Sequence, residues 1–319
     1  MVGGRKMSSV QLQASTGKKR KQKGYRVRLS SGDKVYYAIV YTILILLLII
    51  ILYPLIYIVS ASFSSAKAVT SGKVIFLPVD FSLDGYKAVF EYKPVYTGYR
   101  NTFFYTIVGT FINVAMTMLA AYPLARKNLQ GRGFFTFLFT FTMIFSGGMI
   151  PNYMLISDLK MINTIWAMLI PGAIGVSNVI ITRTFIQTNI PTDLLEASQI
   201  DGCSDALYFF KIVLPLSKAV MSVITLYYAV GHWNAYFSAF LYLNKKELYP
   251  LQLFLREILV MNQFDTEMLI DPEEEEVKQG LADLLKYSLI IVSTVPILCV
   301  YPFVEKYFEK GVMIGSLKG

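Results

Sequence analysis

The chain has 319 residues, of which 55% are hydrophobic and only 16% are charged, and its formal net charge at pH 7 is +9. Aromatic residues make up 14% of the chain and cysteine occurs only twice, which excludes an intrinsically disordered protein, a collagen-like repeat and a disulfide-bonded scaffold. The mean hydropathy of +0.50 is high for a soluble domain, so the distribution of charge along the chain decides the class of protein.

Six stretches of at least 18 residues contain no Asp, Glu, Lys or Arg. A bilayer is crossed by about 20 mainly apolar residues, so each stretch predicts a transmembrane helix. The first is too long for the apolar part of a signal peptide, and we expect it to be retained. The stretches are residues 35–66, 101–125, 133–157, 161–182, 219–244 and 287–304. The predicted fold is therefore all-α, a polytopic membrane protein with six transmembrane helices.

Lys and Arg are concentrated in alternate connections between these stretches. The first 34 residues hold ten of the 30, and three further segments on the same side hold three each. These are Arg126, Lys127 and Arg132; Arg183, Lys211 and Lys218; and Lys306, Lys310 and Lys318. The positive-inside rule then places both termini in the cytoplasm. We therefore divide the chain into a basic cytoplasmic segment at residues 1–34, a transmembrane domain at 35–304 and a cytoplasmic tail at 305–319. Anionic lipid explains the basic segment better than nucleic acid does.

The predicted spans lack the groups that would power transport. Proton- and ion-coupled carriers bury ionisable side chains, whereas here only His232 could titrate within a span, and we expect it to be a packing residue. The chain has no GxxxxGK[ST] phosphate-binding loop. With one His and two distant cysteines, Cys203 and Cys299, a metal site is not expected either. We expect no cofactor on this chain, so another subunit must supply the energy.

Glycine and proline residues mark breaks in the third and fourth predicted helices. They are Gly147, Gly148, Pro151, Pro171 and Gly172. Such residues are tolerated within a membrane where neighbouring groups or cavity water satisfy the freed carbonyls. For residues 147–151, ordinary helix ends at the outer surface are the favoured explanation.

The predicted cytoplasmic connection between the fourth and fifth spans departs from the basic character of its side. Residues 193–205 carry four acids and no base: Asp193, Glu196, Asp201 and Asp205. Pro191 and Asp193 predict a helix start. Leu194, Leu195 and Ala197 form an apolar patch, Gly202 allows a sharp turn, and a second helix runs from Asp205 toward Leu214. The segment suits docking into a groove of a soluble protein, although a linker helix on the membrane surface explains its composition equally well.

This connection resembles a known motif. Glu196-Ala197-Ser198, three residues, Gly202, nine residues and Ile212-Val213-Leu214-Pro215 match the EAA–x3–G–x9–I–x–LP pattern of permeases in bacterial ATP-binding-cassette importers, with Ser198 in place of Ala. The resemblance implies a type I importer permease fold, with residues 191–217 forming the coupling helix that docks on the ATPase. The coupling residues it implies are Glu196, Ala197, Ser198, Asp201, Gly202, Ile212, Leu214 and Pro215.

Other segments resemble carbohydrate permeases in particular. Asn101-Thr102 with residues 121–126 is similar to their second-helix pattern, and Trp233-Asn234 to their fifth-helix element. The end of the chain resembles the tail of the maltose-transporter-like second permease, which reaches the ATPase dimer interface; this implies ATPase contacts for Gly311, Gly315, Lys318 and Gly319. Residues 146–151, and 249–252 with 255–256, resemble permeases for oligosaccharides, including uronate-containing and complex glycans.

The resemblance implies a function and a set of partners. The chain would be a permease subunit of a carbohydrate importer in the bacterial cell membrane, without a catalytic site of its own. A second homologous permease would complete the pathway, two ATPase subunits would use ATP and Mg, and an extracellular sugar-binding lipoprotein would deliver the substrate. A permease for peptide or phosphate remains an alternative. A membrane enzyme or scaffold is a further alternative, although neither acid cluster contains a His.

A sugar pathway needs neutral polar and aromatic side chains, because a sugar presents hydroxyls and flat C–H faces. The candidates are Asn113, Tyr122, Asn178, Trp233, Asn234, Tyr236 and Ser238. Asn234 and Ser238 are four residues apart, so we expect them to share a helix face. Hydrogen bonds between packed helices are an equally good role for each candidate. The long acidic loop at residues 244–286 is predicted to be extracellular; its Glu273–Glu276 run is most simply a solvated turn, or else a steering surface for the binding protein.

Overall fold

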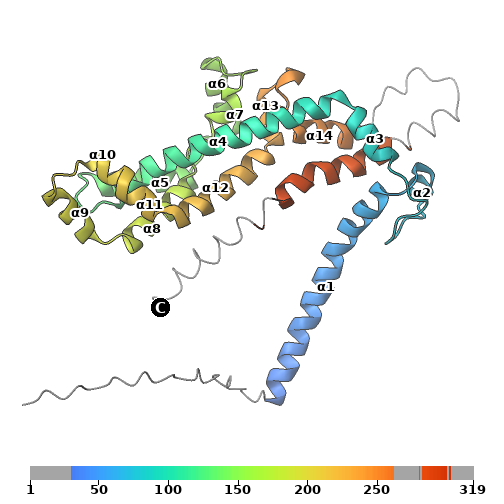
Figure 1. Ribbon diagram of the computed structural model, residues 1–319, viewed down its shortest axis with the longest axis horizontal. Helices are drawn as coiled ribbons and strands as arrows, with labels where there is room; N and C mark the ends of the chain where they lie inside the picture. Colours follow the sequence, from blue (N-terminus) through green and yellow to red (C-terminus); the bar gives the residue numbers. More distant parts are fainter. Residues whose placement is uncertain (1–29, 262–279, 281, 300–301, 303–319) are drawn as a thin grey trace, which may run out of the picture. The chain divides into compact units, whose positions relative to one another are not determined.

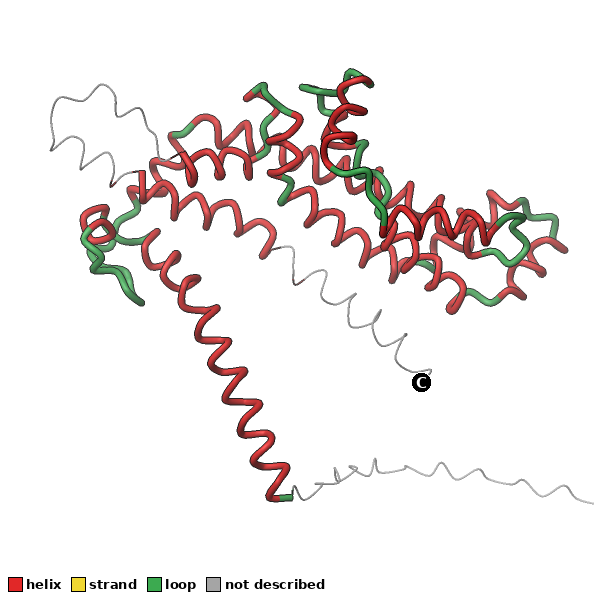
Figure 2. The backbone as a smooth tube through the Cα atoms, turned by 180° about the vertical axis from the view of Figure 1, so that it is seen from behind, coloured by secondary structure: helices red, strands yellow, loops and turns green. Residues whose placement is uncertain are grey.

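The computed structural model describes residues 30–261, 280, 282–299 and 302, and the elements below belong to that part of the chain. Every regular element among these residues is helical (Figure 2). The all-α prediction is therefore confirmed for the described residues. The chain divides into two units, residues 1–52 and 53–319, and each is described by itself.

The first described helix, α1 (Ser31–Ser62), begins in the first unit, and its last ten residues belong to the second. Its start is capped locally, since the Ser30 amide donates to Asp33 Oδ2 at 3.0 Å. Its most apolar window has a mean hydropathy of 3.0 with no residue buried. Apolar side chains are exposed all around this helix, which is the pattern of a helix solvated by lipid.

The longest helix of the second unit is α4 (Lys93–Ala125), which lies beside α12 (Lys218–Trp233), α8 (Val176–Asn189) and α14 (Leu251–Met261) (Figure 1). Small residues on α4 permit this close packing. A Cβ atom at Gly98 would lie 2.9 Å from the Cα of Leu251. As in other membrane proteins, small residues let two helix backbones approach each other.

Two short helices, α2 (Ala66–Thr70) and α3 (Asp84–Glu91), lie between α1 and α4 in the chain. After α12, the chain continues with α13 (Tyr236–Tyr242), the 3-10 turn η2 (Lys246–Leu248) and α14. The side chain of Asn101 on α4 donates to the carbonyls of Glu247 and Tyr249, at 2.7 and 3.0 Å. This part of the predicted loop 244–286 is therefore a helical segment fastened to α4.

Three helices are long and apolar enough to cross a membrane unbroken: α1, α4 and Ala282–Cys299. Two bent pairs raise the number to five: α5 (Arg132–Ile144) with α6 (Met149–Asp158), bent by 113°, and Asp205–Leu216 with α12, bent by 79°. The fourth predicted span is broken into α7 (Trp166–Leu169) and α8, and the fifth changes from α12 to α13. The count of six transmembrane helices predicted from charge-free stretches is not confirmed within the described residues.

The glycine and proline residues predicted to break the third and fourth helices explain why those two spans are interrupted. Between α5 and α6, Gly148 has a φ of +85°, a conformation that a residue with a side chain rarely adopts. Between α7 and α8, the chain passes through Pro171 and Gly172 without helical structure. Breaks at both places are confirmed, although Pro151 lies inside α6 rather than at a break.

Candidate functional site

The first helix of the predicted coupling segment is α9 (Thr192–Ile200), and it begins and ends where the sequence predicts. Pro191 precedes it and Asp193 lies in its first turn, near the positive end of the helix dipole. At its end, the amide of Gly202 donates to the carbonyl of Gln199 at 3.1 Å, and that of Cys203 donates to the carbonyl of Ser198 at 2.9 Å. Gly202 has a φ of +74°. This is the Schellman arrangement, so the turn expected at Gly202 is confirmed.

The second helix of the segment starts at once after that turn. Ser204 caps α10 (Asp205–Tyr208) by accepting from the Leu207 amide at 3.3 Å. The helix then widens into the π-helical turn η1 (Phe209–Val213) and continues as α11 (Leu214–Leu216). The wide turn directly precedes Pro215, whose ring would clash with the carbonyl four residues earlier in an α-helix. The predicted helix is present and passes Pro215 by one residue.

A hydrophobic core holds this segment against the ends of α4 and α8. Its buried members are Met118, Ala125, Ile186, Ile190, Tyr208, Phe209 and Val213. Ser198 is buried as well, and its hydroxyl donates to the carbonyl of Leu195 at 2.7 Å. Leu195 packs against this core, so it does not belong to an exposed patch as the sequence suggested.

An ion pair adds a second attachment that the sequence did not suggest. Arg126 Nη1, just after α4, lies 2.5 Å from Asp205 Oδ1 at the start of α10. Burial acts to lower the pKa of Arg126, but the hydrogen bond to the Asp205 carboxylate opposes it, and the net effect raises that pKa above its ordinary value. The sequence analysis used Arg126 in the basic connection and in the second-helix pattern, but not as a partner of the coupling segment. No local pattern in the sequence connects these two residues.

The outward side of the segment combines apolar and acidic side chains. The exposed fractions are 87% for Ile200, 62% for Phe210 and 42% for Leu207. Glu196 and Asp201 are exposed as well. The expected acidic and apolar surface is therefore present, and Ile200, Leu207 and Phe210 add to Leu194 of the predicted patch, which is 40% exposed.

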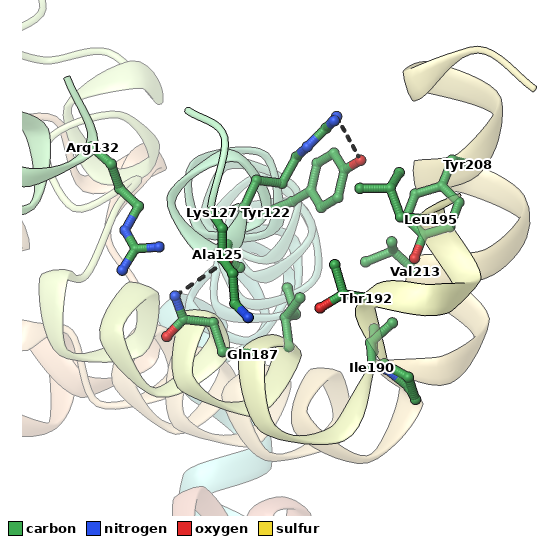
Figure 3. A pocket seen from close by; sticks show the side chains of 13 residues that line it. Tyr122, Ala125, Lys127, Arg132, Gln187, Ile190, Thr192, Leu195, Tyr208 and Val213 are labelled. Carbon is green, nitrogen blue, oxygen red and sulfur yellow. Dashed lines mark hydrogen bonds between the residues drawn. The ribbon is translucent and has the colours of Figure 1, made fainter. Parts of the chain in front are cut away.

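A cavity of about 430 Å³ lies on the inner side of the segment, between the ends of α4 and α8 and the starts of α5 and α9 (Figure 3). Arg126, Lys127 and Arg132 line it together with Tyr122, whose hydroxyl accepts a hydrogen bond from Arg126 at 3.4 Å. The Tyr122 ring centroid is 5.1 Å from that of Phe209. Tyr122, predicted as a pathway residue, therefore packs against the coupling segment.

The remaining pathway candidates separate into two groups. Trp233 is buried and donates from Nε1 to the carbonyl of Ser293 at 3.1 Å, which ties α12 to the helix Ala282–Cys299. Asn234 is exposed and donates to the carbonyl of Val230 on its own helix, while Tyr236 is 45% exposed. Asn234 and Ser238 do not share a helix face, because α12 ends at Trp233 and α13 begins at Tyr236.

Asn113 and Ser238 line a common cavity, which also includes His232. Asn113 is buried, with hydrogen bonds to Gly172 and His232. Asn178 is half-buried on α8, and its amide nitrogen lies near Gly175. The sequence analysis predicted that His232 is a packing residue. The structure shows that it also lines this cavity, next to Asn113.

Some predictions concern residues outside the described part of the chain: the tail residues Gly311, Gly315, Lys318 and Gly319, the Glu273–Glu276 run and residues 1–29. Both cysteines are described and neither forms a disulfide. Within the described residues, no group of three or more His, Cys, Asp or Glu side chains could hold a metal ion.

The helical fold and the loop at α9–α11 define a class of membrane transport subunit. The chain belongs to the family described as binding-protein-dependent transport system inner membrane component, whose model matches residues 94–314.

Particular relatives sharpen this assignment. The chain is 39% identical over 290 residues to the polygalacturonan/rhamnogalacturonan transport system permease protein YtcP of Bacillus subtilis, covering 90% of this chain and 99% of the relative. It is 40% identical over 271 residues to Protein LplC of the same organism, covering 83% and 89%. A crystal structure of a bacterial ABC transporter involved in the import of the acidic polysaccharide alginate contains a chain with a TM-score of 0.79 and 33% identity, covering 88% of this chain and 99% of that chain.

Proposed function

We propose that this protein is a permease subunit of an ATP-driven carbohydrate importer, with oligosaccharides as its substrates. Its family membership supports the transport role. The names of its relatives support the substrate class, since they include permeases for polygalacturonan, rhamnogalacturonan and arabinooligosaccharides. The similarity to a chain of an alginate importer points in the same direction. The protein would then be located in the bacterial cell membrane.

The coupling role is supported by the way in which α9–α11 is attached to the rest of the chain. The segment is anchored from within by a hydrophobic core and by the Arg126–Asp205 pair, while Ile200 and Phe210 remain exposed. Exposed apolar side chains rimmed by charge are typical of an interaction surface. We assign this surface to the ATPase subunit, with Glu196, Asp201 and Gly202 as part of the contact. A rigid attachment lets a movement of the ATPase pass to α4 and α8.

For the membrane topology, we keep six crossings with both termini in the cytoplasm. The distribution of Lys and Arg supports this orientation. The bent pair α5 and α6 would count as one crossing, α12 with α13 as another, and the broken segment at α7 and α8 as a third. Backbone without helical structure is tolerated at membrane depth where it is buried in protein or lines a cavity.

The proposed assembly contains a second homologous permease, two ATPase subunits that use ATP and Mg, and an extracellular sugar-binding lipoprotein. This chain has no catalytic site of its own in the proposal. Gly311, Gly315, Lys318 and Gly319 would contact the ATPase, and the side chains lining the passage would be neutral. A peptide or phosphate permease is the competing function.

The test is transport by the complete complex in proteoliposomes. The panel consists of galacturonate trisaccharide, arabinotriose, raffinose and maltotriose, with a tripeptide and inorganic phosphate as competing solutes. We expect ATP-dependent uptake of at least one sugar when its binding protein is present. Uptake of the tripeptide or phosphate without uptake of any sugar would refute the carbohydrate assignment.

A further inference from the structure

A cavity of about 220 Å³ lies at the break between α7 and α8. Its walls come from α4, from the break itself and from α12 and α13, and they include Asn113, Gly172, His232 and Ser238. A neighbouring cavity of about 430 Å³ shares Pro171, Gly172 and Ser238 with it. The larger one falls in the size range of ordinary ligand pockets. None of the residues lining either cavity is Asp, Glu, Lys or Arg.

The hydrogen bonds of this cavity determine which groups its His presents. Asn113 donates from Nδ2 to the carbonyl of Gly172 at 2.5 Å, which orients the amide so that Oδ1 is an acceptor. His232 Nε2 lies 2.6 Å from that oxygen and must therefore carry the proton. A neutral imidazole has a single N–H, so Nδ1 keeps its lone pair. Among the described residues, Nδ1 has no hydrogen-bond partner.

The imidazole is held in place by the surrounding helices. A Cβ atom at residue 109 would lie 2.4 Å from His232 Nε2, so only glycine lets α4 approach the ring this closely. Nearby, the Tyr228 hydroxyl accepts from the amide of Gly175 at 2.9 Å and lies 2.7 Å from the Thr117 hydroxyl. These bonds fix the broken backbone to α4 and α12. Fixed polar groups are what a selective binding site requires.

Ser238 supplies a second polar group to both cavities. It is half-buried on α13, and its hydroxyl has no hydrogen-bond partner in the described part of the chain. A hydroxyl can donate and accept, while His232 Nδ1 only accepts. Together they offer sugar hydroxyls an acceptor and a second group that can donate or accept.

We propose that the α7–α8 break forms a carbohydrate-binding subsite in which His232 Nδ1 accepts from one sugar hydroxyl and Ser238 bonds a second. Without a cation in its lining, the subsite takes the uncharged, hydroxyl-bearing face of the sugar rather than a carboxylate. The inference rests on the proposed function and adds to it a place on this subunit where the substrate is held.

Two substitutions remove the sugar-binding groups while keeping the network. In His232→Gln, the amide nitrogen can still donate to Asn113, but the acceptor at the Nδ1 position is lost. In Ser238→Ala, a hydroxyl that bonds no described residue is lost. Ser222→Ala is the matched control, because its hydroxyl donates to the carbonyl of Lys218 on α12 and does not line either cavity.

The measurement is uptake, at subsaturating concentration, of the panel sugar that the wild-type complex imports fastest. One lost hydrogen bond should lower the rate by about five-fold, and the double variant by about twenty-fold. Complex assembly and ATPase activity without sugar should remain at the wild-type level, as should all properties of Ser222→Ala.

Each contrary outcome has a distinct meaning. If the wild-type complex imports no panel sugar, the proposed function is refuted, and the subsite with it. If the wild-type complex imports sugar and both variants match its rate, the subsite alone is refuted. If the variants lose assembly or sugar-free ATPase activity in proportion to uptake, His232 and Ser238 are packing residues, which also refutes the subsite.

Discussion

Two turns of the molecule have the same backbone design in different surroundings. Gly202 ends α9 with a φ of +74°, and Gly72 ends α2 with a φ of +67°. At each turn, two amides bond back to the helix in the Schellman pattern; at Gly72 they are those of Gly72 and Lys73, which reach Val69 and Ala68. A Cβ atom at either glycine would meet nothing within 4 Å.

The surroundings distinguish the two turns. After Gly72 the chain returns inward, and Val74 is buried in a cluster with Ala68 and Val69. Beside Gly202, by contrast, Ile200 is 87% exposed, and the next helix begins with Asp205 paired to Arg126. Equal local geometry therefore does not imply equal function. What the turn presents to a partner decides its role, and the four predictions below test this contrast.

The largest effect is expected from Gly202→Leu compared with Gly72→Leu. A side chain in the left-handed conformation costs about 1–2 kcal/mol at either site. Only at Gly202 should the altered turn displace a docking surface. We expect stimulation of ATPase activity by loaded binding protein to fall more than about ten-fold in Gly202→Leu, a loss of about 1.4 kcal/mol of coupling or more, and to persist in Gly72→Leu. Similar losses in both variants would show that the strain, and not the docking, is responsible.

A smaller effect is expected from removing one exposed apolar side chain on each side of the comparison. Burying an Ile side chain contributes about 1.5–3 kcal/mol, so Ile200→Asn should weaken ATPase binding by about ten-fold or more. Leu77→Asn is the control, since Leu77 follows the Gly72 turn and is 76% exposed. The measurement is titration of the ATPase subunit onto the permease complex. Unchanged affinity in Ile200→Asn would remove Ile200 from the interface.

The Arg126–Asp205 pair should have a moderate effect. The side chain of Arg126 is 14% exposed but that of Asp205 is 63% exposed, so solvent screens much of the attraction. We expect Arg126→Gln and Asp205→Asn each to lower coupled ATPase activity by about two- to three-fold, and the double variant to fall no further. Additive losses would show that the two residues act independently.

The smallest effect is expected from the ion pair on α3, which follows the Gly72 turn in the chain. Lys87 Nζ lies 3.0 Å from Asp84 Oδ1, and both side chains are largely exposed. The Ser82 hydroxyl and then Lys87 lower the pKa of Asp84 below its ordinary value. The ionised carboxylate therefore favours the folded state at neutral pH, and this contribution disappears as the pH falls through the lowered pKa. Lys87→Ala should leave thermal unfolding at pH 7 unchanged; a clear drop would contradict the screening argument.

Local chemistry made much of the fold predictable. Absence of charge located α1 and α4, because only apolar side chains suit lipid on all sides. Gly148, Pro171 and Gly172 predicted breaks, since glycine permits unusual backbone conformations and proline lacks an amide donor. The turn at Gly202 followed from the same reasoning.

Other features escaped the sequence analysis because their signals are not local. The helix α14 was hidden within a predicted loop, since Arg256 and Glu257 interrupt its apolar pattern, although Leu251, Leu253 and Phe254 are buried. The prediction that Asn234 and Ser238 share a helix face was wrong, because it assumed a continuous helix. No local rule indicated the end of α12 at Trp233.

Sequence alone was enough to locate the apolar stretches, the turn at Gly202, and the mixture of acidic and apolar side chains in α9. These properties depend on side chains and backbone within a few residues of each other. The pairing of Arg126 with Asp205 and that of Asn113 with His232, which is 119 residues away, could be seen in the three-dimensional structure alone. Such pairs depend on which helices pack side by side. The packing of α4 against α12 depends on the shape of the whole contact, including the space that Gly109 leaves for an imidazole ring.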